Sequence, residues 1–276
     1  MTSRASLMGT AFVLLADLVQ PLRMPLWRWW YNRLAKKYTS EDLLFMNYGY
    51  ADPVATGSPL KLKEQDEPYR YPIQLYEYVT NRVDLQNKDV LEVGCGRGGG
   101  MKHLAGAYPL HKITGVDLSK IAVAWCRQHH RLPNAEFLQG RAEDLPLNDH
   151  SVDLVINVES SHCYADMSKF VNEVFRVLRP DGIFTFCDLR TPGGVDEVKS
   201  LFQKAGFDII YEEQINQQVV RALDLVYEQR KRELQYAVPK IWRKVMRDFA
   251  ALKGSSVYNK FRQGELQYVH YLMQKR

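Results

Sequence analysis

Two groups of residues in this chain are of types that could do chemistry. The first is the run Val90-Leu-Glu-Val-Gly-Cys-Gly-Arg-Gly-Gly-Gly100, where an apolar stretch ends in an acid and then in glycines. Glycine has no Cβ, so a ligand can lie directly on the backbone there. A strand that enters such a turn before a helix is typical of nucleotide binding. Gly94, Gly96 and Gly99 also match the spacing G-x-G-x-x-G, so a nicotinamide dinucleotide is the main alternative ligand.

The second group is the segment Asn157-Val-Glu-Ser-Ser-His-Cys-Tyr164, which follows an apolar run that predicts a buried strand. His162 is therefore expected at the carboxyl edge of a sheet, where parallel sheets bind their ligands. Histidine titrates near neutral pH and can take a proton from a reacting group. Glu159 and Tyr164 flank it and could orient it or a substrate. The alternative is a histidine that only makes structural hydrogen bonds.

The elements that must position these residues alternate between strand and helix from residue 88 onward. Strands are expected at residues 89–93, 112–116, 135–139, 152–158, 183–187 and 207–211, and helices at 98–107, 119–130, 167–178 and 195–205. Ser119 is a suitable N-cap for the second helix, and Arg179-Pro-Asp-Gly182 is a turn signal. This alternation predicts an α/β fold with a parallel, doubly wound sheet.

Two regions do not follow the alternation. Residues 1–80 precede the first core strand and are rich in aromatic residues and prolines. Residues 216–262 separate the sixth strand from a last strand at about 266–273. In that insert Ile241, Val245, Phe249 and Leu252 recur at helical spacing, which predicts an amphipathic helix.

The ordered set of motifs resembles the S-adenosylmethionine-dependent methyltransferases of the Rossmann-like class. Within that class the chain is similar to the phthiotriol/phenolphthiotriol dimycocerosate methyltransferases, which O-methylate a long-chain lipid hydroxyl. The matching segments are residues 27–31, Phe45-Met-Asn-Tyr48, Asp66-Glu-Pro68, the glycine run, His130-Arg-Leu-Pro133, residues 157–164 and Cys187-Asp-Leu-Arg190. The resemblance implies a mostly parallel seven-stranded sheet whose last strand is antiparallel. It also implies an N-terminal helical lid and a helical insert before that strand.

The resemblance also implies which residues hold S-adenosylmethionine. The turn of Gly94, Cys95, Gly96 and Gly98 would hold the amino-acid tail with Glu92 and Asn157, Asp117 would accept hydrogen bonds from the ribose, and Leu118, Ala142 and Glu143 would meet adenine. Each member has a structural alternative, since glycines end strands, Asp117 could cap the next helix and Glu143 could be a surface charge. The four elements in this order are more specific than any one of them.

The expected domain organisation is a lid segment over residues 1–80 and a methyltransferase domain over 81–276, with residues 216–262 as a substrate cap. Aromatic residues of the lid could form an apolar wall suited to a hydrophobic substrate, or could belong to a plain core. The candidates for this wall are Trp27, Trp30, Tyr31, Phe45 and Tyr48.

An apolar stretch at residues 7–19 follows Arg4 and is interrupted by Asp17. It is too short to span a bilayer, which needs about 20 residues, and it lacks an evident signal-peptide cleavage site. Three interpretations stay open: a helix packed on the core or on a second subunit, an interfacial membrane helix, and a lid. A cytoplasmic enzyme is expected, with peripheral membrane contact or homo-oligomer formation through this segment left open.

Composition places the chain among ordinary globular proteins, since 46% of its 276 residues are hydrophobic and 25% are charged. Its net charge is +5, and the basic residues at 230–232 and 240–247 are interpreted as a solvated helical face rather than a nucleic-acid or anionic-lipid patch. The four cysteines form no C-x-x-C pair, so free thiols are expected and no metal site is predicted.

The sequence therefore predicts a methyltransferase that acts on a hydroxyl of a hydrophobic small molecule, such as a lipid, polyketide or other natural product, with His162 as general base. The alternative is a C-methyltransferase of a prenyl or terpenoid substrate, in which the alkene attacks unaided. A nucleic-acid methyltransferase is disfavoured, because Asn157-Val-Glu-Ser160 lacks the Asn-Pro-Pro-aromatic signature and no reading module appears. An inactive scaffold is disfavoured by the intact acids Glu92, Asp117 and Glu143.

Overall fold

The structure, a computed structural model, describes residues 44–52, 60–237 and 243–276. The apolar stretch at 7–19 and three of the expected wall residues, Trp27, Trp30 and Tyr31, lie outside the described residues. Within the described part of the chain, no helix combines the length and the apolar character needed to cross a bilayer.

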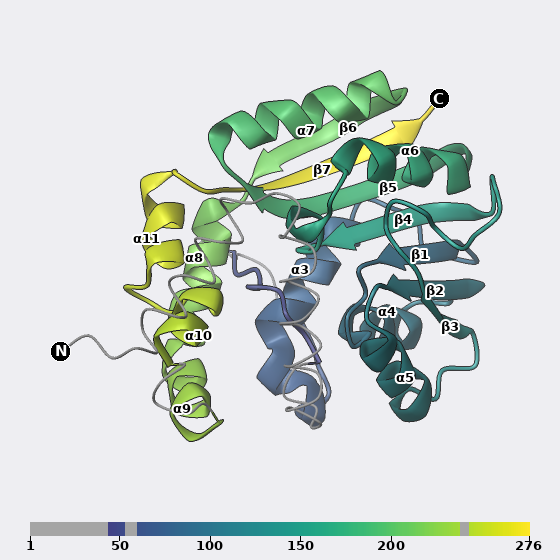
Figure 1. The fold of residues 1–276 in the computed structure, drawn as a ribbon. Helices are drawn as coiled ribbons and strands as arrows, with labels where there is room; N and C mark the ends of the chain where they lie inside the picture. Colours follow the sequence, from purple (N-terminus) through teal and green to yellow (C-terminus); the bar gives the residue numbers. More distant parts are fainter. Residues whose placement is uncertain (1–43, 53–59, 238–242) are drawn as a thin grey trace.

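The centre of the molecule is a seven-stranded sheet (Figure 1). Its strands are β1 (Asp89–Val93), β2 (Lys112–Asp117), β3 (Ala135–Gln139), β4 (Val152–Val158), β5 (Leu178–Arg190), β6 (Phe207–Gln214) and β7 (Gln267–Lys275). They lie in the order β3-β2-β1-β4-β5-β7-β6, and only the pairings of β7 with β5 and β6 are antiparallel. The predicted Rossmann-like architecture is therefore confirmed. The strand order reverses between β1 and β4, which is where such sheets bind ligands.

Helices cover both faces of the sheet. They are α3 (Arg70–Thr80), α4 (Gly99–Ala107) and α5 (Lys120–His129) on one face and α6 (Met167–Val177) and α7 (Pro192–Lys204) on the other. Successive residues of a strand point to opposite faces, so Val90 packs in the core under α3 and Leu91 in the core under α6. Glu92 then points to the α3 side, and this alternation decides which helix meets its carboxylate.

Local sequence signals explain several boundaries. The Ser119 hydroxyl accepts a hydrogen bond from the Ala122 amide at 3.3 Å and so caps α5 as expected. The predicted turn at residues 179–182 lies inside β5, where the register with β4 shifts between Val152 and Leu154. The extra residues loop out there, so the strand pairs on both sides of the irregularity.

The described residues of the insert between β6 and β7 form four helices. They are α8 (Asn216–Leu225), α9 (Tyr227–Ala237), α10 (Arg243–Phe249) and α11 (Ser256–Gln263). A helix is present in the predicted place as α10, but it ends at Phe249, before Leu252, and Ala251 takes the positive φ of 46°. Ile241 lies outside the described residues. Figure 1 shows these helices as a column beside α3, at the side of the sheet toward which the parallel strands point. A short 3-10 helix, Glu64–Tyr69, leads into α3.

Candidate active site

The glycine turn lies where β1 ends, against the loop that follows β4. Gly94 has a φ of +76°, and its amide donates to the Val116 carbonyl at 2.8 Å. A Cβ on Gly94 would lie 2.5 Å from the Cβ of Ser160 and 2.8 Å from the Tyr164 hydroxyl. Only glycine satisfies both the backbone angle and this close approach. The turn therefore brings the two groups of residues found in the sequence to one place.

Glu92 is buried beside this turn. Its Oε1 accepts a hydrogen bond of 2.6 Å from the Tyr76 hydroxyl of α3, whereas its Oε2 has no partner among the described residues. Burial raises the pKa of Glu92 to about 7, although the Tyr76 hydroxyl opposes the shift. A Cβ on Gly100 would overlap the Tyr76 ring, so glycine at this position leaves the room that Tyr76 needs to reach the carboxylate. The last glycine of the run thus serves packing.

Asp117 closes the other side of the turn at the end of β2. Its Oδ2 accepts from the Gly96 amide at 2.9 Å and its Oδ1 from the Ser119 amide at 2.8 Å. Burial raises the pKa of Asp117, while these two amides favour its charged form. A carboxylate has about four acceptor positions, so two remain for other donors. Asp117 therefore holds the turn in shape and keeps the capacity to bind hydroxyls.

Asn157 joins the turn to the loop after β4. Its Nδ2 lies within 2.9 Å of the Val93 carbonyl, 2.8 Å of the Ser160 hydroxyl and 3.0 Å of the Tyr164 hydroxyl. Its Oδ1 is buried and has no partner among the described residues. Tyr164, which the sequence places beside His162, instead turns its hydroxyl to Asn157 and Ser160.

The other residues expected at the cofactor lie around these. The Cys95 sulfur packs against Gly115, since a Cβ on Gly115 would lie 2.8 Å from it. The Cys95 side chain therefore belongs to the core, while its backbone belongs to the turn. Gly98 is the left-handed N-cap of α4. Leu118 is half-buried and Ala142 is buried. The Glu143 carboxylate accepts from the Ala165 amide at 2.9 Å, which links the loops after β3 and β4.

These atoms fit a ligand that carries cationic or donor groups. Two buried acceptors, Glu92 Oε2 and Asn157 Oδ1, border the glycine turn and lack hydrogen bonds within the described residues. Buried acceptors without partners are costly, and a bound donor would remove that cost. An ammonium group placed near Glu92 would also favour its carboxylate form.

His162 lies in the short 3-10 helix Ser161–Cys163 after β4 and is held by Asp188 of β5. Its Nδ1 is 2.8 Å from Asp188 Oδ1, and its backbone amide donates to Asp188 Oδ2 at 3.0 Å. A carboxylate at Nδ1 favours the tautomer with its proton there, which makes Nε2 the basic nitrogen. The arrangement therefore gives His162 the orientation that a general base requires.

Asp188 is fully buried and anchors a wider network. It also accepts from the Ser161 hydroxyl at 2.5 Å and lies 3.3 Å from the Arg190 guanidinium, which in turn donates to Ser161 at 2.6 Å. Burial alone would raise the pKa of Asp188, but the positive charges of His162 and Arg190 hold it well below its usual range. The carboxylate is therefore ionised at neutral pH.

The same network sets the proton affinity of His162. Burial alone would lower the pKa of His162, but the neighbouring Cys163 side chain and the Asp188 carboxylate outweigh it and raise the pKa well above its ordinary value. The charged form of the imidazole is thus favoured over that of a free histidine. The charged imidazole must lose a proton before it can accept one from a substrate, so its activity as a base should grow with pH.

Glu159, also expected beside His162, has its own partners. Its Oε1 accepts from the Tyr48 amide and from the Tyr268 hydroxyl, both at 2.5 Å. Burial raises the pKa of Glu159 to about 7, against these two hydrogen bonds. Its φ of +43° is unusual for a residue with a side chain. Glu159 thus ties the segment 44–52 to β4 and β7.

That segment, residues 44–52, lies over the glycine turn. A Cβ on Gly99 would meet the Leu44 carbonyl at 2.5 Å and the Phe45 ring at 3.0 Å. The Phe45 ring also contacts Tyr76, with centroids 6.0 Å apart. Tyr48 packs on Phe261 of α11 at 5.7 Å, edge to face. Of the two expected wall residues that the structure describes, Phe45 therefore lies against the glycine turn and Tyr48 against α11.

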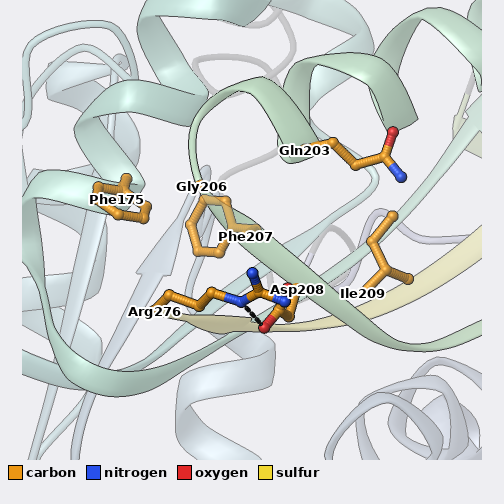
Figure 2. A pocket seen from close by; sticks show the side chains of 7 residues that line it. All are labelled: Phe175, Gln203, Gly206, Phe207, Asp208, Ile209 and Arg276. Carbon is orange, nitrogen blue, oxygen red and sulfur yellow. Dashed lines mark hydrogen bonds and ion pairs between the residues drawn. The ribbon is translucent and has the colours of Figure 1, made fainter.

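A surface depression of about 670 Å³ lies elsewhere (Figure 2). Its lining residues are Phe175, Gln203, Gly206, Phe207, Asp208, Ile209 and Arg276. Phe207 begins β6 and Arg276 follows the end of the antiparallel β7, so the depression is at the amino edge of the parallel strands. It is therefore separate from the glycine turn at the carboxyl edge.

Comparison with solved structures identifies the class of fold. The chain is similar to a cyclopropane synthase from Mycobacterium tuberculosis, with a TM-score of 0.65 and 18% identity over 82% of this chain and 92% of that one. It is also similar to a geranyl diphosphate C-methyltransferase from Streptomyces coelicolor, solved with S-adenosyl-L-homocysteine, with a TM-score of 0.60 and 17% identity over 85% and 90%. The fold is that of the class I methyltransferases.

Sequence comparison gives the family. Residues 91–186 match the family model described as a methyltransferase domain. The chain is 34% identical over 249 residues to the phthiotriol/phenolphthiotriol dimycocerosates methyltransferase of Mycobacterium tuberculosis, covering 90% of this chain and 92% of that one. It is 36% identical over 247 residues to the fatty-acid O-methyltransferase of Mycolicibacterium smegmatis, covering 89% and 88%. The chain therefore belongs to this family of S-adenosylmethionine-dependent methyltransferases.

The sequence interpretation did not find several residues of the site. Asp188 stands in the motif Cys187-Asp-Leu-Arg190, and an acid at the carboxyl end of a predicted strand was the available signal. Tyr76 and Tyr268 gave no such signal, because each reaches its carboxylate from a distant element.

Proposed function

We propose that this protein transfers a methyl group from S-adenosylmethionine to a hydroxyl of a hydrophobic small molecule. The observation that carries the proposal is the pair of His162 and Asp188 at the carboxyl edge, beside the glycine turn. An alcohol is a weak nucleophile until it loses its proton, and an oriented histidine can accept that proton. The names of the relatives, which refer to phthiotriol and phenolphthiotriol dimycocerosates and to a fatty acid, support a hydrophobic acceptor.

When bound, S-adenosylmethionine supplies an activated methyl group on a positively charged sulfur. We assign its amino-acid tail to the turn of Gly94–Gly98, Glu92 and Asn157, its ribose to Asp117 and its adenine to Leu118, Ala142 and Glu143. The partnerless Glu92 Oε2 and Asn157 Oδ1 support the first assignment. The remaining acceptor positions of Asp117 support the second.

The chain's own residues orient the acceptor and move its proton. His162 Nε2 would take the hydroxyl proton as the oxygen attacks, and Asp188 would stabilise the resulting imidazolium. Phe45 and Tyr48 would exclude water and contact an apolar chain. Because the methyl donor is already activated, alignment supplies much of the rate and the base supplies the rest.

The test compares wild type with His162→Ala on two acceptor types, a long-chain alcohol and a prenyl alkene, with labelled methyl donor. We expect an O-methyl ether from the alcohol, a loss of about 10²–10⁴-fold in turnover for the variant, and unchanged donor affinity. Ser168→Ala, at an exposed position on α6, is the matched control and should behave as wild type. A C-methylated alkene as the preferred product, or full turnover in His162→Ala, would contradict the proposal.

A further inference from the structure

The cap insert, residues 216–262, carries an unusual share of the charge. It contains eleven Lys and Arg residues but four Asp and Glu residues, a net charge of +7 against +5 for the whole chain. The remaining residues therefore carry a net charge of −2. A domain with such an asymmetry presents a localised positive potential to its surroundings.

Four exposed cations of the cap gather near each other, and we call them the cap cation cluster: Lys244, Arg247, Lys253 and Arg262. Lys244 and Arg247 lie one turn apart on α10. The Arg247 guanidinium donates to the Lys253 carbonyl at 3.3 Å, and the positive charge of Arg262 acts on the Lys253 amine. The three segments α10, the loop after it and α11 thus meet at one surface.

Acids compensate this cluster only in part. Asp224 forms an ion pair of 3.0 Å with Lys253, and Asp248 accepts from the Ser256 amide at 2.8 Å. Lys244, Arg247 and Arg262 form no ion pair with the part of the chain that the structure describes. Like charges held together without acids repel one another, so a partner with negative charge would stabilise the arrangement.

Two exposed apolar side chains lie on α8 and α9, the helices that pack against α11 and α10 respectively. Leu225, which is 53% exposed, follows the Asp224 that pairs with Lys253. Tyr236, which is 90% exposed, follows Gln235, whose carbonyl accepts from Arg243 at the start of α10. A cap that carries both exposed cations and exposed apolar side chains suits a lipid interface, where apolar groups enter the headgroup region and cations meet phosphates.

From these observations we infer that the cap cation cluster docks on an anionic membrane surface, in place of the solvated helical face that the sequence alone indicated for residues 240–247. The inference goes beyond the proposed function and rests on it in one point, the hydrophobic character of the acceptor. A hydrophobic acceptor would partition into a bilayer, where a docked enzyme can reach it. The cap lies at the carboxyl edge of the parallel strands (Figure 1), so docking would hold the catalytic side of the sheet at the lipid.

The test is co-sedimentation of the full chain with vesicles of phosphatidylglycerol and phosphatidylcholine, and with pure phosphatidylcholine. We expect binding to the anionic vesicles only, weakened by salt. The double variant Lys244→Glu/Arg247→Glu should lose at least tenfold in partitioning, since each cation at such a surface contributes about fivefold. The matched control Lys169→Glu/Lys204→Glu, on the exposed surface of α6 and α7, should bind as wild type.

Other outcomes overturn the inference. These are equal binding to both vesicle types, undiminished binding of Lys244→Glu/Arg247→Glu, loss of binding only on deletion of residues 1–43, and salt-sensitive binding to single-stranded RNA without vesicle binding. Turnover with a detergent-dispersed acceptor is measured in parallel and should be equal in wild type, in Lys244→Glu/Arg247→Glu and in the control Lys169→Glu/Lys204→Glu. A protein that binds anionic vesicles but methylates no acceptor would refute the proposed function and leave the docking surface standing.

Discussion

Replacing Asp188 by Asn tests how the carboxylate controls His162. The substitution keeps the size of the side chain and removes a buried negative charge 2.8 Å from Nδ1. A carboxylate at this distance typically raises a histidine pKa by about 1–3 units, or about 1.4–4 kcal/mol. The His162 side chain is 24% exposed, and its partner is fully buried, so solvent screens the pair only partly. The pKa of His162 should therefore fall by an amount in that range.

The assay is the pH dependence of kcat/KM together with NMR titration of the imidazole. A base must be neutral, so wild-type activity should rise with pH until His162 has lost its proton. In Asp188→Asn the rise of kcat/KM with pH, the acid limb of the profile, should occur at lower pH. The maximal kcat/KM at high pH should fall, because the imidazole ring is no longer held in one tautomer. Ser168→Ala, exposed on α6, is the control. An acid limb that stays in place would refute the assignment of His162 and Asp188 as a linked pair.

The free energy of unfolding should also depend on pH through the His162 pKa. The folded pKa of His162 is raised, so its contribution to folding is fully present below about pH 6.5, the unfolded value, and is lost as pH rises through the folded pKa. Denaturant titrations of wild type should therefore show a decline above pH 6.5 that Asp188→Asn reduces. The variant should also be less stable overall by about 3–5 kcal/mol, the usual cost of breaking a buried pair.

Three further predictions concern the turn and its neighbours. Gly94→Ala should lose about 1–3 kcal/mol of stability and most donor affinity in denaturation and calorimetry, whereas Gly106→Ala, whose Cβ would meet no atom within 4 Å, should lose neither. Asp117→Ala should weaken donor binding by about 1–3 kcal/mol, and unchanged affinity in calorimetry would reject its ribose role. Glu159 keeps its proton to about pH 7 when folded, so wild-type stability should fall between pH 4.5 and 7. Glu159→Gln should make that slope shallower, and an equal slope in both proteins would contradict the burial of this carboxyl.

Much of the fold followed from local signals. Buried parallel strands read as apolar runs, and the strands at residues 89–93 and 152–158 have the predicted bounds. The edge strand at 135–139, in which only Phe137 is buried, has them as well. The ends of the helices inside the insert could not be predicted in this way, because the helical spacing of Phe249 and Leu252 does not reveal that Ala251 leaves the helix. Spacing reports which residues share a face and not where backbone hydrogen bonds end.

The sequence by itself determined the order of strands and helices, the glycine turn and the acids Glu92 and Asp117 beside it, because these depend on periodicity and on residues adjacent in the chain. Only the tertiary structure decided the partners of the buried polar groups. It paired His162 with Asp188, since β4 and β5 lie side by side while their sequence positions lie far apart. It also turned the Tyr164 hydroxyl to Asn157, through the path of the loop that follows β4. Such pairings depend on strand register and helix docking, which no local pattern encodes.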